Sequence, residues 1–149
     1  MVMGGVGQES TAMKLVVSRN QWFSLNPMLT PRSQHACTKV TLNNRPGVVV
    51  SGGINRHSHN MSSVDFFDLN SGRWVSLPGL SRGRRGHTMT SLDGKLAVLG
   101  GSSSTVQGDT EYLNDVEMFN GREWKPARIR MDQPRDGANI VKIPNHLIF

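Results

Sequence analysis

The chain has 149 residues, of which 36% are hydrophobic and 19% are charged. This length fits one ordinary domain, and the composition argues against intrinsic disorder. The 17 Lys and Arg residues outnumber the 11 Asp and Glu residues, and the resulting net charge of +6 favours acidic partners, either nucleic acid or an acidic or phosphorylated segment of a protein.

The sequence lacks the features of a membrane or secreted protein. No apolar run approaches the roughly 20 residues that cross a bilayer, and the first residues do not form a signal peptide. The single cysteine, Cys37, excludes an internal disulfide, and its strand context predicts a buried thiol. The expected location is therefore cytoplasmic, with the nucleus left open and no membrane contact expected.

Paired glycines recur with a fixed period. Gly4-Gly5, Gly52-Gly53 and Gly100-Gly101 stand 48 residues apart, and each pair ends a short apolar run. A tryptophan follows each pair, and these are Trp22, Trp74 and Trp124. A period of about 40 to 50 residues with these features is typical of the blades of a β-propeller.

Short apolar runs between turn signals predict strands throughout and no helix. In the first unit the predicted strands are 1–5, 13–18 and 21–23, with a turn at Arg19-Asn20. In the second unit the predicted strands are 35–42, 47–53, 64–69 and 73–77. The polar clusters at 43–47 and 70–72 are predicted turns between them.

The third unit repeats this order. Its predicted strands are 87–92, 95–101, 114–119 and 122–125, with a long loop over 102–113. Asp93-Gly94 and Asn120-Gly121 are dipeptides that favour two-residue hairpin turns. A last, partial unit predicts strands at 137–143 and 146–149 around a turn at 144–145. The chain is thus expected to be a single region, 1–149, with units at about 1–23, 32–77, 84–125 and 135–149.

Further residues recur at fixed offsets. Arg-x-x-His opens the second unit at 32–35 and the third at 84–87, and Val-acidic-x-Phe follows at 64–67 and 116–119. This pattern resembles the kelch repeat. The resemblance implies an all-β fold, a partial kelch-type β-propeller with a little over three four-stranded antiparallel blades. Val17 is taken as the first unit's equivalent of Phe67 and Phe119.

Most of the recurring residues are expected to build the blades and not to perform chemistry. Glycine pairs permit close backbone approach, and the aromatic residues supply apolar area between blades. The residues expected to have this structural role are Gly4, Gly5, Trp22, Gly52, Gly53, Phe67, Trp74, Gly100, Gly101, Phe119 and Trp124.

The long connections are expected to share one end of the blades and to form the binding face, because binding residues usually sit on loops held by a rigid scaffold. Arginine suits recognition of carboxylate or phosphate groups. The candidate partner-binding residues are Arg32, Arg56, Arg82, Arg84, Arg85 and Arg135. Arg32 and Arg84 recur with the repeat, so a structural role for these two stays open.

The hypothesis for function is a protein–protein interaction module. The family resemblance implies the substrate-recognition part of a cullin-based ubiquitin ligase adaptor, and the alternative is an actin- or cytoskeleton-binding kelch protein. A kelch-type propeller enzyme is less favoured, because Tyr112 and Cys37 lie in different units and no catalytic constellation stands out. His57 and His59 alone do not predict a metal site, no cofactor is expected, and the aromatic residues sit at framework positions, which disfavours nucleic acid.

The number of units poses a physical problem. Propellers close with at least about four blades, and exposed blade edges favour pairing with other chains. Three explanations stay open. The chain is part of a longer BTB-kelch protein, two copies pair into one ring, or the blades form an open array.

Overall fold

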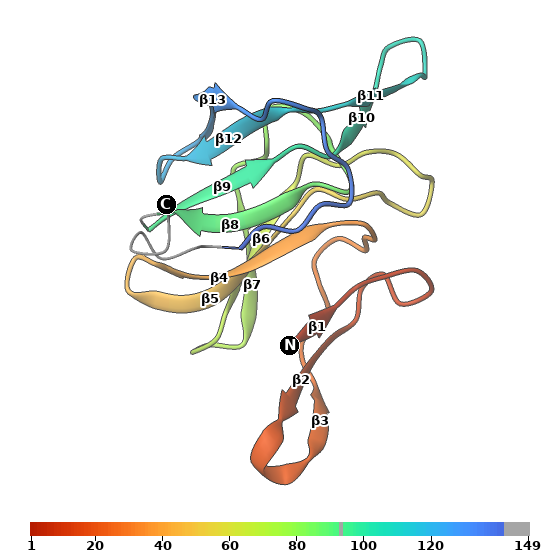
Figure 1. The fold of residues 1–149 in the computed structure, drawn as a ribbon. Coiled ribbons are helices and arrows are strands. Elements are labelled where there is room, and N and C mark those ends of the chain that lie inside the picture. The colour runs from red at the N-terminus through yellow and green to blue at the C-terminus, as the bar shows by residue number, and fades with distance from the viewer. Residues whose placement is uncertain (93, 142–149) are drawn as a thin grey trace.

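The computed structural model describes residues 1–92 and 94–141, and it is all-β apart from one turn of 3-10 helix at Val17–Arg19. The strands form successive antiparallel sheets, which we call the first, second and third blades (Figure 1). The prediction of an all-β fold built from successive antiparallel blades is therefore confirmed. No helix in the described part of the chain is long and apolar enough to span a membrane.

The first blade contains three strands in the order β1-β2-β3. They are β1 (Val2–Met3), β2 (Ala12–Val16) and β3 (Gln21–Ser24). The turn between β2 and β3 uses the 3-10 helix and then Asn20, which has a left-handed backbone with φ 46°. Asparagine tolerates this conformation better than most residues, so the polar Arg19-Asn20 signal identified the turn correctly.

The second blade contains four strands in chain order. They are β4 (Ala36–Leu42), β5 (Arg45–Ser51), β6 (Val64–Asp68) and β7 (Arg73–Leu77). The β4–β5 turn is shorter than predicted, because Asn43 and Asn44 both have positive φ, 49° and 60°. Two such residues make a tight hairpin turn, and β5 therefore begins at Arg45 and not at Gly47.

The third blade has the strand order β13-β12-β9-β8. Its strands are β8 (Thr88–Leu92), β9 (Lys95–Leu99), β12 (Asp115–Phe119) and β13 (Trp124–Arg130). Phe119 pairs with Trp124, so the connection between β12 and β13 has four residues, 120–123. The prediction of a two-residue turn at Asn120-Gly121 was therefore wrong, and β13 starts later and runs further than predicted.

The predicted loop 102–113 and the predicted strand 137–143 both need correction. The predicted loop 102–113 contains a small hairpin of β10 (Ser102–Ser104) and β11 (Thr110–Tyr112). These strands are short and polar, so hydrophobic alternation does not reveal them. Residues 137–141 of the predicted strand 137–143 form no strand. Its last residues, its proposed partner 146–149, and Asp93 of the Asp93-Gly94 turn lie outside the described residues.

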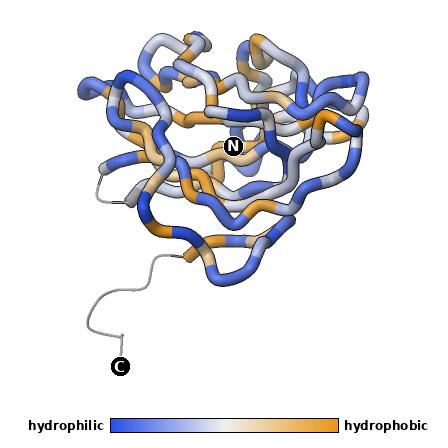
Figure 2. Tube along the Cα trace, turned by 90° about the horizontal axis from the view of Figure 1, so that it is seen from above, coloured by the Kyte–Doolittle hydropathy of each residue, from blue (hydrophilic) through white to orange (hydrophobic). Residues whose placement is uncertain are grey.

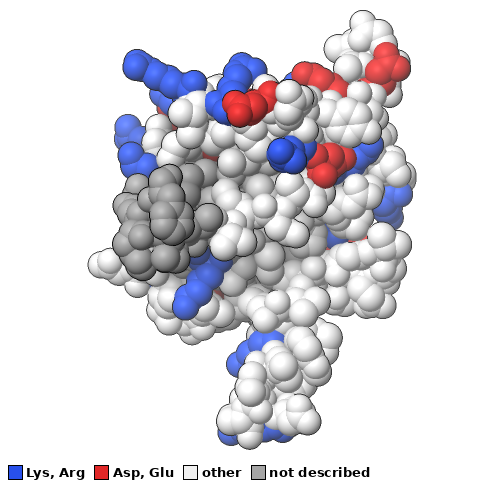
Figure 3. Space-filling model, viewed as in Figure 1, with Lys and Arg blue, Asp and Glu red and all other residues white. Residues whose placement is uncertain are grey.

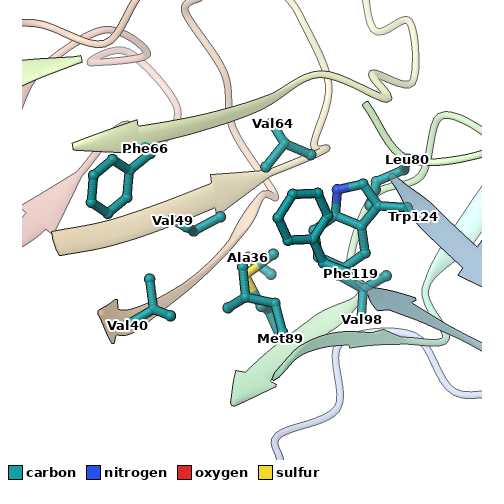
Figure 4. Packing of buried hydrophobic residues seen from close by; sticks show 11 residues of the cluster. Ala36, Val40, Val49, Val64, Phe66, Leu80, Met89, Val98, Phe119 and Trp124 are labelled. Carbon is teal, nitrogen blue, oxygen red and sulfur yellow. The ribbon is translucent and has the colours of Figure 1, made fainter. Parts of the chain in front are cut away.

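The apolar core lies between the blades. Val49 and Phe66 of the second blade face Val98, Phe119 and Trp124 of the third (Figure 4). Each fully buried side chain of this kind stabilises the fold by about 1.5–3 kcal/mol. Apolar segments accordingly run through the sheets, and hydrophilic segments dominate the outer connections (Figure 2). Neighbouring blades therefore stabilise each other.

A smaller cluster joins the first blade to the second. Met3, Ala12 and Met28 pack against Val50, and Trp74 covers the cluster from outside. The indole N–H of Trp74 donates to the Asn26 carbonyl oxygen at 2.8 Å. Trp124 makes the same type of bond, 3.0 Å long, to the Pro78 carbonyl oxygen. Each of these tryptophans is thus fixed to the connection that precedes its own blade.

The first blade departs from the expected pattern. Leu15 pairs with Trp22 as Phe67 pairs with Trp74, so Leu15 and not Val17 is the equivalent residue. Val17 lies in the 3-10 helix and is exposed. Trp22 is 47% exposed, whereas Trp124 is 5% exposed, because no described blade packs on its side of the sheet. Cys37, expected to be buried, is also exposed on β4.

Candidate protein-binding face

The long connections of all three blades lie at one end of the molecule, and the tight turns lie at the other (Figure 1). The connections also contact one another across blade boundaries. The Asn60 side-chain amide donates to the Ser104 hydroxyl at 3.1 Å, and Arg82 forms a 2.8 Å ion pair with Glu111. We call this end the loop face. Its loops come from separate blades but form one surface, as the topology predicts.

Backbone hydrogen bonds link successive connections at the inner edge of this face. The Gly86 N–H donates to the Gln34 carbonyl oxygen at 3.0 Å, and the Gly137 N–H donates to the Gly86 carbonyl oxygen at 2.7 Å. All three residues have positive φ, between 53° and 68°. Each blade thus begins from a connection held by the preceding one, which fixes the side chains of neighbouring blades relative to each other.

An open hollow of about 670 Å³ lies at this inner edge. Its walls come from the starts of β4 and β8, from β11 and from the segment after β13. The side chains that line it are mainly polar and come from Gln34, His35, His87, Tyr112, Asp136 and Asn139. Tyr112 is 60% exposed, and Asp136 accepts a 3.1 Å hydrogen bond from the Ser102 hydroxyl. The hollow therefore offers donors and acceptors to a ligand.

The two histidines in the wall are held as neutral rings. Burial, followed by the charge of Arg84, lowers the pKa of His87 to about 3. Burial and the charge of Arg32 lower the pKa of His35 to about 4. The His87 Nε2 atom lies 2.8 Å from the Ser51 hydroxyl. A β-carbon on Gly52 would lie 2.6 Å from the His87 ring, which explains the glycine at this position.

Arg32 is fully buried and does not reach the surface. Its guanidinium donates to the carbonyl oxygens of Gly52 and Ser63 at 3.1 and 3.0 Å, and it pairs with Asp65 at 2.5 Å. The arginine therefore ties the connection before the second blade to two strands of that blade. Its assignment as a partner-binding residue needs correction, because its donors are used inside the fold.

Arg84 repeats this arrangement in the third blade. It is also fully buried, and it donates to the Gly100 carbonyl oxygen at 3.1 Å. It pairs with Asp115 at 2.9 Å and with Glu117, whose side chain is completely buried. Removing one partner of such a buried pair typically costs about 3–5 kcal/mol, so Arg84 is a structural residue.

The other candidate arginines are closer to solvent, in different surroundings. Arg56 is exposed, and its Nε atom donates to the neighbouring His57 ring at 3.1 Å. Arg82 is engaged by Glu111. Arg85 is partly exposed, and no carboxylate among the described residues pairs with it. Arg135 is exposed and lies on the connection after the third blade. The structure thus leaves Arg56, Arg85 and Arg135 as cations of the loop face.

Charges on the molecular surface are mixed. Lys and Arg side chains lie beside Asp and Glu side chains over the upper part of the molecule, and they do not merge into one basic patch (Figure 3). Arg128 and Arg130 belong to β13 and not to a loop. In the described part of the chain, no group of three His, Cys, Asp or Glu residues converges in a way that could hold a metal ion.

Sequence reasoning gave a binding role to none of the six polar side chains that line the hollow. His35 and His87 were noted only as part of the repeat pattern, and Gln34, Tyr112, Asp136 and Asn139 were not singled out as site residues. A signal for Gln34 was present, because it stands two residues after Arg32, as Gly86 stands two residues after Arg84. Tyr112 belongs to the unpredicted β11 and Asn139 to the predicted strand 137–143. Their positions depend on tertiary structure, and the sequence pattern did not indicate them.

Comparison with known proteins agrees with this architecture. The kelch motif matches residues 83–128. The chain is 26% identical over 149 residues to Kelch-like protein 40 of Xenopus tropicalis, covering 94% of this chain and 24% of that protein. It is 34% identical over 106 residues to an F-box/kelch-repeat protein of Arabidopsis thaliana, covering 70% and 25%. A second such protein is 33% identical over 95 residues, covering 64% and 25%.

The blades and the loop face therefore define a propeller module of the protein-interaction type. The kelch motif and these similarities confirm the resemblance to kelch-repeat proteins that was drawn from the sequence. It spans about a quarter of the length of the curated relatives that it matches.

Proposed function

We propose that the chain binds a partner protein through the loop face and acts as the substrate-recognition part of a cullin-based ubiquitin ligase adaptor. The observation that carries the binding proposal is the polar hollow of about 670 Å³, which is framed by connections from different blades. A rigid scaffold that presents such loops is the usual arrangement for recognition. No catalytic group is needed for this role. The proposed location is the cytoplasm.

The adaptor role is supported by the other domains that the names of the relatives give together with kelch repeats. The names of two of them join kelch repeats to an F-box, a domain found in ubiquitin ligase adaptors, and a third is a Kelch-like protein. In such an adaptor the kelch region would bind the protein to be modified, and another part would bind the ligase. The substrate-binding part of this proposal agrees with the polar groups that are exposed on the loop face.

The proposed ligand is an acidic or phosphorylated segment. Arg85 precedes Gly86, which lines the hollow, and the Arg85 side chain is partly exposed. Its backbone is fixed by two hydrogen bonds to Ser102, of 2.9 and 2.8 Å. Arg56 supplies a second cation on the same face. Glu9 and Glu111 are also on this face, so the ligand should place its negative charge near Arg85 and neutral polar groups elsewhere.

The test compares Arg85→Glu with Arg122→Glu. Both residues carry solvent-accessible side chains, but Arg122 lies in the tight turn 120–123 at the opposite end. Partner proteins are first captured with the wild-type chain. Matched acidic, phosphorylated and neutral peptides from these proteins are then assayed for binding to the wild-type chain and to each variant. Arg85→Glu should weaken binding of the acidic peptides at least tenfold, because it replaces attraction by repulsion, whereas Arg122→Glu should have less than a twofold effect.

Equal binding by wild-type and Arg85→Glu chains would contradict the proposed face. A cullin that co-purifies with the full-length protein and its captured substrate supports the adaptor role, and absence of any cullin opposes it. Co-sedimentation of the chain with actin filaments, unaffected by Arg85→Glu, would favour the cytoskeletal alternative.

A further inference from the structure

Three residues from separate segments form one row across the small hairpin of the third blade. Ser102 on β10 pairs directly with Tyr112 on β11. On its other side Ser102 forms an antiparallel bridge with Arg85, and the two residues exchange backbone hydrogen bonds of 2.9 and 2.8 Å. Side chains of directly opposed residues project from the same face of an antiparallel sheet. Arg85, Ser102 and Tyr112 therefore point to one side.

That side of the hairpin faces the hollow. Tyr112 lines the hollow, and the Ser102 hydroxyl donates to Asp136, which lines it as well. Glu111, the neighbour of Tyr112 on β11, points the other way and pairs with Arg82, as the alternation of side chains along a strand requires. The row thus brings one cation and one phenol to the same wall of the hollow.

The two long side chains of the row are within reach of each other. Directly opposed residues have β-carbons about 4.5–5.5 Å apart, so two such steps separate the β-carbons of Arg85 and Tyr112 by roughly 10 Å. The residue between them is a serine, whose short side chain does not obstruct its neighbours. No ion pair in the described part of the chain uses Arg85, so its charge is available to a group carried by the tyrosine.

The Tyr112 side chain is accessible to an enzyme. Tyr112 is 60% exposed, and all three residues of β11 are exposed. The hairpin of β10 and β11 is a separate two-stranded sheet that projects from the third blade (Figure 1). A two-stranded hairpin is only marginally stable, so β11 can detach locally and enter the cleft of an enzyme in extended form.

The sequence around the tyrosine is acidic. Asp109 and Glu111 precede Tyr112 by three residues and by one residue, and Tyr112 is the only tyrosine in the chain. Protein kinases select substrates partly by the pattern of charge around the acceptor residue. Acidic residues ahead of an exposed tyrosine form such a pattern.

We propose that Tyr112 is a tyrosine phosphorylation site, and that its phosphate pairs with Arg85 and prevents acidic ligands from binding in the hollow. A protein tyrosine kinase transfers the γ-phosphoryl group of ATP to the phenol oxygen. The new P–O bond forms as the bond to ADP breaks, and the phenol proton is released. The regulatory consequence rests on the proposed function of the loop face, whereas the modification itself does not.

The charges around the tyrosine direct the phosphate to Arg85. A phosphotyrosine carries about −1.5 to −2 charges at pH 7 and is repelled by neighbouring carboxylates. The nearby carboxylates, Glu111 and Asp136, are held by Arg82 and by the Ser102 hydroxyl. The two histidines of the hollow are neutral and supply no competing cation. Pairing of the phosphate with Arg85 removes the cation that the proposed ligand requires.

Phosphorylation of the folded chain tests the site itself. A panel of tyrosine kinases is first screened on a synthetic peptide spanning 106–117, and a kinase that accepts the peptide is incubated with ATP and the intact chain. Intact-protein mass spectrometry should show a single added phosphate on the wild-type chain and none on Tyr112→Phe. A peptide that no kinase accepts, or a folded chain that stays unmodified while the peptide reacts, would overturn the proposal.

Titration of the phosphate tests its contact with Arg85. Phosphorus NMR of the phosphorylated wild-type chain should give a second phosphate pKa at least about 0.3 below that of phosphorylated Arg85→Gln, because a nearby cation favours the dianion. Arg56→Gln is the matched control, since Arg56 is exposed on a different loop, and it should leave the value unchanged. Equal values with and without Arg85 would refute the pairing.

Binding of the acidic peptides described above tests the regulation. Phosphorylation should weaken their binding about tenfold or more and change binding of the neutral peptides less than about twofold. Unchanged binding of the acidic peptides would contradict the regulatory role. If the unmodified chain binds no acidic peptide, the proposed function fails and the regulation falls with it. Mass spectrometry and the phosphate titration then still decide whether Tyr112 is modified and pairs with Arg85.

Discussion

Single residues in the connections between blades have a left-handed backbone conformation, which is unfavourable for most residues other than glycine. Gln34, Gly86 and Gly137 have φ values of 53°, 60° and 68°, and their peptide groups form the chain of hydrogen bonds around the hollow. Glycine adopts this conformation freely, whereas a residue with a β-carbon pays about 1–2 kcal/mol. Gln34 is the one of the three that carries this cost.

Exchanges at two equivalent positions should therefore change stability in opposite directions. Gln34→Gly should raise the free energy of unfolding by about 1 kcal/mol, because relief of the strained backbone outweighs the added freedom of the unfolded chain. Gly86→Ala should lower it, because φ is 60° and the new β-carbon would lie 1.7 Å from the Asp136 carboxylate. Urea unfolding measures both, and changes of the same sign would contradict the assignment.

At the scale of elements, the last strand of the second blade and that of the third blade are each held by a tryptophan whose indole N–H bonds to the preceding connection. Trp124 on β13 packs against Phe119 with ring centroids 5.3 Å apart, and Trp74 on β7 packs against Phe67 at 5.0 Å. Trp22 on β3 has the equivalent place but pairs with Leu15 and is half exposed. Identical residues in equivalent strands therefore contribute unequally.

Alanine substitutions should reveal this inequality. Trp124→Ala should destabilise the protein by about 3–5 kcal/mol, because it leaves a cavity in the core between the second and third blades. Trp22→Ala should cost less than about 1 kcal/mol, in line with an exposed site. Thermal unfolding followed by near-ultraviolet circular dichroism compares them, and similar losses for both would mean that Trp22 is buried in solution.

At the scale of the whole molecule, two buried histidines at the boundaries between blades make the stability of the fold depend on pH. His35 and His87 lie near Arg32 and Arg84, whose positive charges add to the effect of burial in opposing protonation. The folded protein thus keeps both rings neutral at pH values where an unfolded chain protonates them. Because these groups occur at consecutive boundaries, their effect acts on all blades together.

Acidification should consequently weaken the fold before the carboxylates titrate. The pKa values of about 4 and 3 in the folded state lie below the unfolded value near 6.5, so the unfolded chain binds more protons as pH falls through 6.5. The loss approaches about 1.4 kcal/mol per pH unit for each histidine. Urea midpoints should fall from pH 7 to pH 5, and His87→Gln should roughly halve the slope. An unchanged midpoint in the wild type would refute this account.

The sequence predicted the regular parts of the fold well. Strands such as β6, with Val64 to Asp68 buried throughout, are continuous and bounded by turn residues, and local preference alone locates them. Predictions failed where pairing decides the structure. Pairing with β12 extends β13 to Arg130, and the register between β2 and β3 places Leu15 opposite Trp22. No local signal in either segment specifies its partner strand.

The candidate site was predicted only in outline. The end of the blades that bears the long connections followed from topology, since hairpins alternate between two ends. Which arginines face solvent did not follow, because Arg84 and Arg85 are adjacent in sequence yet one is fully buried and the other partly exposed. Burial of a charge depends on carboxylates from distant strands, here Asp115 and Glu117.

The sequence by itself determined the repeat, the kelch-type blade and the order of its strands, because these depend on glycine pairs, turn residues and apolar runs that act locally. Only the tertiary structure decided the role of each repeat arginine. Arg32, Arg84 and Arg135 share one backbone geometry, but a guanidinium becomes structural only where a blade surrounds it with a carbonyl and a carboxylate. That neighbour is a property of packing, which a local pattern does not contain.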